Sequence, residues 1–179
     1  MRSGHAIVTA LPSFACYAIP MAKATNPIPP GFHSITIHLC IPGAGRYMDF
    51  LKRTFNAVEI SQSPGPGGKL MHAIARIGDS VIMFADDFGA EMGMPPLAKG
   101  RMPYHVNLYV PDADATWKQA VAAGCEITMP IGDQFWGDRY GHVRDPFGVD
   151  WAIATRKEEL TPAELQERAA KAFGAAGHA

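Results

Sequence analysis

Apolar stretches separated by Gly- and Pro-rich breaks divide the first half of the chain into five elements. Residues 34–41 (SITIHLCI) are β-branched and apolar, which predicts a strand. Residues 44–56 place apolar side chains at helical spacing and predict an amphipathic helix. Three further strands are expected over 57–63, 69–77 and 80–85. The predicted order of this half is therefore β-α-β-β-β.

The second half of the chain repeats this order. Its predicted elements are a strand over 104–110, a helix over 113–123, a strand over 125–130, a loop over 131–139, and strands over 140–144 and 149–155. The halves superpose at an offset of about 69 residues, with Ile41-Pro42 falling on Val110-Pro111. A paired repeat of this length predicts two similar sheets that close around a shared interior.

The two ends of the chain carry different signals. Residues 1–20 contain an apolar stretch that Pro12 interrupts, so we interpret them as a non-core leader, with an upstream start codon a better explanation than a secretory signal. Residues 161–164 (TPAE) form a capping-box pattern and predict a last helix, to about residue 173. The predicted organisation is a leader and Pro-rich arm over 1–32, a single domain over 33–156 with modules 33–87 and 102–156, and a C-terminal helix and tail over 157–179.

Composition narrows the classes of partner. The formal net charge is −1 and charged residues make up 18% of the chain, so no basic field exists to attract nucleic acid or an anionic membrane. No apolar run has the length of a membrane span. Cys16, Cys40 and Cys125 are widely spaced and form no CxxC, which argues against a disulfide framework or a cysteine-based zinc site. A cytoplasmic protein with a small-molecule partner fits this composition best.

Three segments carry a specific resemblance: KLMHAIARIGDSVIMFAD (69–86), DQFWGDRYGHVRDPFG (133–148) and WAIATRKEELTPAEL (151–165). With the repeated βαβββ order over 33 to about 156, they resemble the vicinal oxygen chelate superfamily, the glyoxalase/bleomycin-resistance/dioxygenase group. The resemblance is more specific to its PhnB-like, glyoxalase-related branch. It implies an α+β fold in which two βαβββ modules form a cupped mixed sheet, followed by a C-terminal helix.

The resemblance also bears on metal binding. Enzymes of the superfamily commonly bind one divalent metal in the cup, through His and Glu side chains on the first and fourth strands of each module. Carried over residue by residue, these positions fall on Thr36, Met83, His105 and Ala152. Only His105 is a competent ligand, whereas zinc and iron sites usually need three or more donors. We therefore expect no cofactor and no standard metal site, and a divalent metal on relocated ligands is the alternative.

Strand alternation assigns side chains to the cup, because residues i and i+2 share a face. One parity of the four relevant strands is uniformly apolar, as a face packed under helices requires. The other parity faces the cup and contains Thr36, His38, Val81, Met83, Ala85, His105, Asn107, Tyr109, Asp150, Ala152 and Ala154. This set is polar for a sheet interior, which indicates a ligand pocket.

Three cup residues carry the candidate catalytic chemistry. His38 or His105 is predicted to act as general base or acid, with Asp150 orienting or charge-pairing the imidazole. The same three side chains as a displaced metal site, and a hydrogen-bonded cup without a reaction, are the alternatives. The predicted substrate contacts are Thr36, His72, Met83, Asn107, Tyr109, Phe135, Trp136 and Arg139.

The predicted loop at the cup mouth contains the last three of these contacts. Phe135 and Trp136 would offer apolar contact, and Arg139 would attract an anionic substrate. An Asp138–Arg139 pair that holds the loop is the alternative. His142, in the strand predicted over 140–144, is expected to be solvated or to brace the following turn.

These observations predict a glyoxalase-like small-molecule-binding protein or metal-independent enzyme. The leading reaction is acid/base chemistry on a carbonyl compound, of the lyase or isomerase type. A non-catalytic, ligand-sequestering protein like those of the bleomycin-resistance group is one alternative, and a metal-dependent lyase or dioxygenase with relocated ligands is another. The expected partner is a small molecule, with no nucleic acid and no membrane, and a homodimer is a further option.

Overall fold

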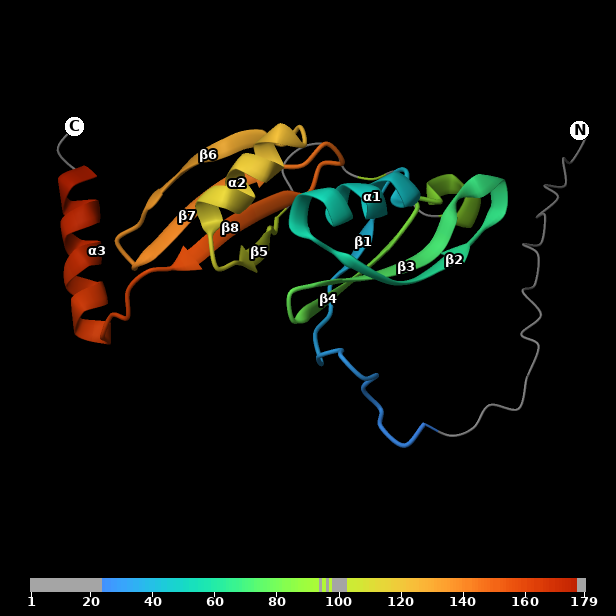
Figure 1. Cartoon of the computed structure of the whole chain (residues 1–179), viewed down its shortest axis with the longest axis horizontal. Coiled ribbons are helices and arrows are strands. Elements are labelled where there is room, and N and C mark those ends of the chain that lie inside the picture. Colours follow the sequence, from blue (N-terminus) through green and yellow to red (C-terminus); the bar gives the residue numbers. More distant parts are fainter. Residues whose placement is uncertain (1–23, 94, 96, 98–102, 177–179) are drawn as a thin grey trace, which may run out of the picture.

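Two four-stranded mixed sheets, each with one covering helix, form the body of the protein (Figure 1). The computed structural model describes residues 24–93, 95, 97 and 103–176, so the predicted leader and residue 102, where the second module was expected to begin, lie outside the described residues. The N-terminal sheet has the order β1-β4-β3-β2 and the C-terminal sheet the order β5-β8-β7-β6. The predicted α+β fold with two βαβββ modules is confirmed.

The elements of the N-terminal module are β1 (His38–Cys40), α1 (Ala44–Phe55), β2 (Val58–Pro64), β3 (Leu70–Ile77) and β4 (Ser80–Ala85). Those of the C-terminal module are β5 (Val106–Tyr109), α2 (Ala113–Ala122), β6 (Glu126–Asp133), β7 (Asp138–Arg144) and β8 (Asp150–Arg156). Two short 3₁₀ turns, Pro66–Gly68 and Gly89–Met92, and a last helix, α3 (Pro162–Ala176), complete the described chain. In each module the first strand runs parallel to the fourth, and the remaining pairs are antiparallel.

The registers of the two sheets repeat as the sequence predicts. His38 lies opposite Met83 in the first sheet, and Asn107 lies opposite Ala152 in the second, at the same offset of about 69 residues. The parity expected to face the helices is buried, for example Leu39 and Phe84 in the first module. Alternation alone was therefore enough to assign the faces of these strands.

Two predicted boundaries are wrong. The first strand begins at His38 rather than at residue 34, because its pairing with β4 begins only at His38, opposite Met83. Ile35 consequently lies outside the sheet and is 91% exposed. Residues 131–139 are not a loop: β6 and β7 continue through them and leave only a short turn, which Gly137 closes with a positive φ of 93°.

The modules share one core between the helices and the sheets. Figure 1 shows α1 and α2 next to each other at the centre, with the sheets spreading to either side. The rings of Phe55 and Trp151 lie 4.5 Å apart across the modules, and the Gln119 side chain donates a hydrogen bond to the Arg53 carbonyl. Because each helix covers one face of its sheet, the opposite face of each sheet is left for a site.

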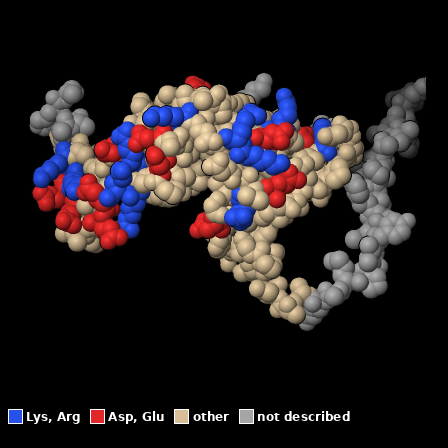
Figure 2. Space-filling view, in the orientation of Figure 1, with Lys and Arg blue, Asp and Glu red and all other residues tan. Residues whose placement is uncertain are grey.

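The C-terminal helix stands at the outer end of the C-terminal sheet (Figure 1). Its predicted capping box is confirmed, since the Thr161 hydroxyl accepts from the Glu164 backbone N–H and the Glu164 carboxylate accepts from the Thr161 N–H. Around this helix, acidic and basic side chains are mixed (Figure 2). Among the described residues, no helix has the length and apolarity needed to cross a membrane.

Candidate functional site

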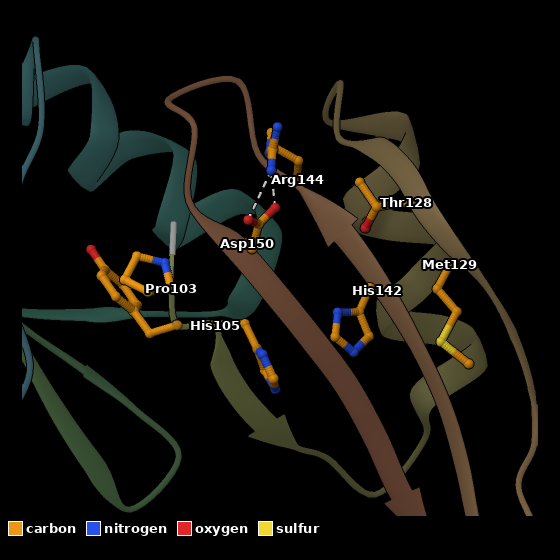
Figure 3. Close-up of a pocket in the computed structure, with 8 residues that line it drawn as sticks. Pro103, His105, Thr128, Met129, His142, Arg144 and Asp150 are labelled. Carbon is orange, nitrogen blue, oxygen red and sulfur yellow. Dashed lines mark hydrogen bonds and ion pairs between the residues drawn. The ribbon is translucent and has the colours of Figure 1, made fainter. Parts of the chain in front are cut away.

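A cavity of about 760 Å³ lies on the face of the C-terminal sheet that α2 leaves open (Figure 3). It is lined by Pro103, Tyr104, His105, Thr128, Met129, His142, Arg144 and Asp150. Its size falls within the range of small-molecule pockets in proteins, which is roughly 300–1,000 Å³. The C-terminal sheet therefore carries the candidate site.

Two imidazoles meet above a small residue in this cavity. Ala152 is central in β8, opposite His142 of β7 on one side and Asn107 of β5 on the other. Because alanine projects only a methyl group, the His105 and His142 rings approach above it, with centroids 4.8 Å apart and planes tilted by 57°. The sequence predicted His105 here but placed His142 in solvent or at the turn, and that second prediction is wrong.

The ring of His142 is held from its own strand. The Tyr140 hydroxyl lies 2.6 Å from His142 Nε2, and both side chains project from the same face of β7 because they are two residues apart. Burial raises the pKa of the Tyr140 hydroxyl, and the nearby charge of Asp138 raises it further. The tyrosine consequently keeps its proton, and the direction of its hydrogen bond to Nε2 depends on the tautomer of His142.

Asp138 organises the neighbouring part of the face. Its Oδ2 accepts hydrogen bonds from the Tyr109 hydroxyl at 2.8 Å and from the Trp136 indole N–H at 3.1 Å. The bond to Asp138, together with burial, raises the pKa of Tyr109. Both predicted contacts, Tyr109 and Trp136, are thus tied to one buried carboxylate at the end of the sheet.

Asp150 is paired with an arginine. Two nitrogens of Arg144 lie 2.8 and 2.9 Å from its two carboxylate oxygens, a bidentate ion pair across β7 and β8 (Figure 3). The hydrogen bond to Asp150 raises the pKa of Arg144. The structure thus pairs Asp150 with Arg144, whereas the sequence predicted a histidine partner, although Asp150 and His105 do line one cavity.

His38 lies on the other sheet. Its ring stacks on His72 of β3, with centroids 5.6 Å apart, and its pKa is lowered by burial and by the charge of His72. Met83 is its register partner on β4, while the Thr36 hydroxyl donates to the His33 carbonyl in the arm. The N-terminal sheet therefore carries a histidine pair of its own, and the predicted trio of His38, His105 and Asp150 does not meet within one chain.

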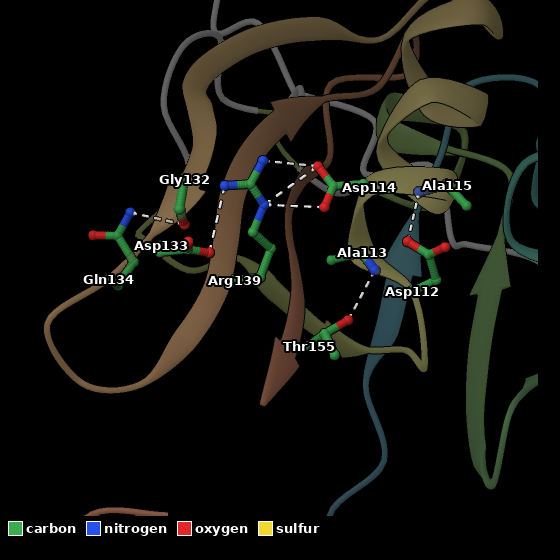
Figure 4. A network of polar contacts seen from close by, with 9 residues as sticks. All are labelled: Asp112, Ala113, Asp114, Ala115, Gly132, Asp133, Gln134, Arg139 and Thr155. Atoms are coloured by element: carbon green, nitrogen blue, oxygen red, sulfur yellow. Dashed lines mark hydrogen bonds and ion pairs between the residues drawn. The ribbon is translucent and has the colours of Figure 1, made fainter. Parts of the chain in front are cut away.

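Arg139 points toward α2 (Figure 4), and it is not among the residues that line the cavity. Its guanidinium makes a bidentate contact with Asp114 of α2 and also contacts Asp133 of β6. The alternative Asp138–Arg139 pair is likewise wrong, since Asp138 is bonded to Tyr109 and Trp136. Arg139 is therefore positioned to hold helix to sheet.

The remaining predicted contacts are divided between two places. Asn107 and Tyr109 border a second cavity of about 650 Å³, between the outer edge of β5 and the β3–β4 turn. Phe135 packs edge-on against Trp136 and reaches Phe173 of α3, with ring centroids 5.0 and 5.5 Å apart. These aromatic side chains anchor α3 to the sheet.

The donors present do not fit the metal site of the superfamily. Thr36, Met83 and Ala152 occupy three of its four ligand positions, and none of them supplies a carboxylate or an imidazole. Within residues 24–93 and 103–176, no group of three or more His, Cys, Asp or Glu side chains is arranged to hold a metal ion. No step of the proposed chemistry is therefore assigned to a metal.

Sequence reasoning missed Tyr140, His142 and Arg144. They alternate along β7 with the buried Gly141 and Val143, so they share the face that carries Asp150 on β8. Applying the alternation rule to residues 138–144 would have identified all three.

Comparison with known proteins agrees with this architecture. A sequence profile of the Glyoxalase/Bleomycin resistance protein/Dioxygenase superfamily matches residues 31–153, and the protein belongs to this superfamily.

The protein also resembles particular members. Rv0887c of Mycobacterium tuberculosis, described as uncharacterized, is 38% identical over 136 residues, which are 74% of this chain and 80% of the relative. The crystal structure of TioX from Micromonospora sp. ML1 is similar with 26% identity and a TM-score of 0.55, over 68% of this chain and 97% of TioX. The PhnB protein from Bacillus cereus shares the fold with 19% identity and a TM-score of 0.57, over 69% of this chain and 99% of PhnB.

Proposed function

We propose that this protein binds a small carbonyl compound in the C-terminal cavity and catalyses proton transfer on it without a metal. The observation that carries this proposal is the pair of imidazoles 4.8 Å apart in a cavity of about 760 Å³. Imidazole is the side chain whose ordinary pKa suits proton transfer near neutral pH. His105 is the proposed base, and the reaction is of the lyase or isomerase type.

The charges in the cavity favour an uncharged substrate. Among the described residues that line the cavity, Arg144 is the arginine, and Asp150 already neutralises its charge through two hydrogen bonds. A phosphate or carboxylate on the ligand would have to compete with Asp150 for the guanidinium. A hydroxyketone or a comparable neutral carbonyl compound fits this environment better than an anion.

Exchange with solvent deuterium of the hydrogen on the carbon beside the carbonyl tests the proposed proton transfer. Small hydroxyketones and, for comparison, 2-oxo acids are incubated with the protein in D₂O, and deuterium incorporation is followed by ¹H NMR. Exchange of a hydroxyketone above the buffer rate, lost in His105→Ala and kept in His33→Ala, is the expected result. Equal exchange by wild type and His105→Ala overturns the assignment of the base. His33 is the matched control because it lies exposed in the arm before β1.

Ligand sequestration is the second candidate function, supported by the same cavity. It predicts saturable binding of a hydroxyketone with no exchange of its protons. Isothermal titration alongside the NMR assay separates the two functions, since binding without exchange supports sequestration alone.

We further propose that a second copy of the chain completes the cup. The observations in support are that β1 and β5 are edge strands of their sheets and that His38 and His105 lie on separate sheets. Placing β1 of one copy next to β5 of the other would bring His38 of one chain toward His105 of its partner.

Complementation tests the shared site directly. His38→Ala and His105→Ala chains are each expected to lose activity, while co-expression restores about one quarter of it, because half of the random dimers contain one intact site. A monomer in sedimentation velocity, or a mixed dimer with no recovery, contradicts the shared site.

A further inference from the structure

Tyr140 and His142 form a hydrogen bond, and which of the two groups donates decides the tautomer of His142. The 2.6 Å separation joins the phenol oxygen to Nε2 of the imidazole. Tyr140 is half-buried, and Asp138, two residues earlier on the same strand, presents a carboxylate nearby. Both features favour the neutral phenol over a phenolate. A neutral phenol can donate or accept, and the hydroxyl donating to Nε2 is the stronger of the two arrangements, because a phenol O–H is more acidic than the N–H of a neutral imidazole and the unprotonated ring nitrogen is a better acceptor than a phenol oxygen.

A neutral imidazole carries one proton, and an accepting Nε2 leaves that proton on Nδ1. We propose that Tyr140 is a positioning residue that fixes His142 as the neutral Nδ1–H tautomer, so that the two cavity histidines perform different tasks. His105 takes the substrate proton, and His142 donates a hydrogen bond from Nδ1–H to the substrate oxygen. This inference rests on the proposed function and adds the roles within the same site.

The division of tasks gives a balanced proton transfer. The C–H bond next to the substrate carbonyl breaks, and the proton moves to a ring nitrogen of His105. The electron pair forms the C=C bond of an enolate, whose oxygen accepts the hydrogen bond from His142. The His105 proton exchanges with solvent, and return of a proton from His105 to the same carbon regenerates the carbonyl and completes the exchange.

A neutral histidine is suited to the second task. Two imidazolium ions with ring centroids 4.8 Å apart would repel each other, so a tautomer held neutral by Tyr140 lets His105 accept a proton alone. A neutral imidazole that polarises a carbonyl is an established way to stabilise an enolate, because its donor strength is matched to the developing charge. The specificity this implies is for substrates with a hydrogen on the carbon beside an uncharged carbonyl group.

The tautomer can be observed without any substrate. In ¹⁵N-labelled wild-type protein at pH 8, long-range ¹H–¹⁵N spectra are expected to show His142 with protonated Nδ1 and unprotonated Nε2. Tyr140→Phe is expected to shift the ring toward the Nε2–H form that free neutral histidine prefers. Tyr109→Phe is the matched control, because Tyr109 is another tyrosine of this face but donates to Asp138.

Two results would overturn the proposal: an Nε2–H form of His142 in wild type, or an unchanged tautomer in Tyr140→Phe. If Tyr140→Phe does not fold, the wild-type spectrum alone tests the proposed tautomer of His142. In the exchange assay, Tyr140→Phe is expected to lower kcat about tenfold with little change in KM, and equal kcat values contradict the assigned role. Absence of exchange in wild type would refute the proposed function, whereas the spectra test the tautomer independently.

Discussion

Asp86 and Thr155 make equivalent hydrogen bonds at positions about 69 residues apart. The Asp86 carboxylate accepts from the backbone N–H of Ala44 at 3.1 Å, and the Thr155 hydroxyl accepts from the N–H of Ala113 at 2.8 Å. Asp86 directly follows β4 and Thr155 lies near the end of β8, and each satisfies the first N–H of its module's helix. The repeat therefore extends from the backbone to the attachment of helix to sheet.

The two positions are predicted to differ in energetic weight. Asp86 also accepts from the N–H groups of Gly43 and Leu70, both at 2.7 Å, whereas Thr155 uses its own proton to bond the Val110 carbonyl. Asp86→Ala is expected to lower the free energy of unfolding by about 2–4 kcal/mol and Thr155→Val by about 1 kcal/mol. Urea denaturation measures both, with Thr155→Ser as the control, and equal losses would contradict the ranking.

Asp86 also predicts a pH dependence. Burial by itself raises the pKa of this carboxyl, but hydrogen bonds from Leu70, Ala44 and Gly43 more than offset burial and hold it below its ordinary value. A pKa lowered by folding adds stability above the pKa of the unfolded chain and loses it as pH falls through the folded pKa. The difference in unfolding free energy between wild type and Asp86→Asn should therefore shrink between pH 7 and about pH 3.

Comparing those two proteins isolates Asp86 from other buried carboxyls. Burial raises the pKa of Asp145 even though it accepts hydrogen bonds, so its contribution to stability has the opposite sign and falls as pH rises. Asp145 is present in both proteins and cancels. A difference that stays constant with pH would show that Asp86 has the same pKa in both states.

Gly141 is predicted to be irreplaceable for steric reasons. A Cβ at this position would lie 2.6 Å from the Trp117 ring and 2.8 Å from the Ile131 backbone. Gly141→Ala is therefore expected to cost about 1–3 kcal/mol through overpacking of α2 against the sheet. Gly45→Ala is the control, because a Cβ in the first turn of α1 meets open space and is expected to stabilise the helix by up to about 1 kcal/mol. Thermal melts of the two variants should shift in opposite directions.

Arg144 and Asp150 are predicted to be coupled. Arg144→Met leaves the nearly buried Asp150 carboxylate without its bidentate partner, and Asp150→Asn removes the charge that the guanidinium contacts. The double variant should unfold at a higher urea concentration than Arg144→Met alone, because no carboxylate is then left unpaired. Additive effects in the double-mutant cycle would mean that the pair is not an energetic unit.

Metal binding is predicted to be weak. The cavity offers the imidazole of His105, the imidazole of His142 that Tyr140 contacts, and an Asp150 already bonded to Arg144, a poor donor set for zinc or iron. Elemental analysis after incubation with zinc, iron or nickel and removal of unbound ions should find well below one equivalent. A stoichiometric metal that is lost in His105→Ala would instead support the relocated-ligand alternative.

Sequence periodicity predicted the strands whose two faces differ in polarity. It placed His105 and Asp150 on one face because residues two apart share a side of a strand. It did not predict that 131–139 continue two strands, since Gly132, Gly137 and the aromatic residues between them resemble a loop. A loop assignment hides alternation, and the orientation of Arg139 was missed for that reason. His142 lies in the predicted strand over 140–144, to which the alternation rule was not applied.

Sequence periodicity could not predict that His38 and His105 are separated in the structure. Alternation gives the face of a strand but not the position of one sheet relative to another. That position depends on the packing of α1 and α2 and on contacts such as Phe55 with Trp151, which no local pattern encodes.

The alanine beneath the two imidazoles also bears on how chemistry changes within this superfamily. Ala152 lies in register with His142, at a position where metal-dependent relatives are expected to carry a ligand. A carboxylate here beside His105 and His142 would bring the donors to the three that zinc enzymes use. The side chain at this one position therefore separates the donor set of this cup from that of a zinc site.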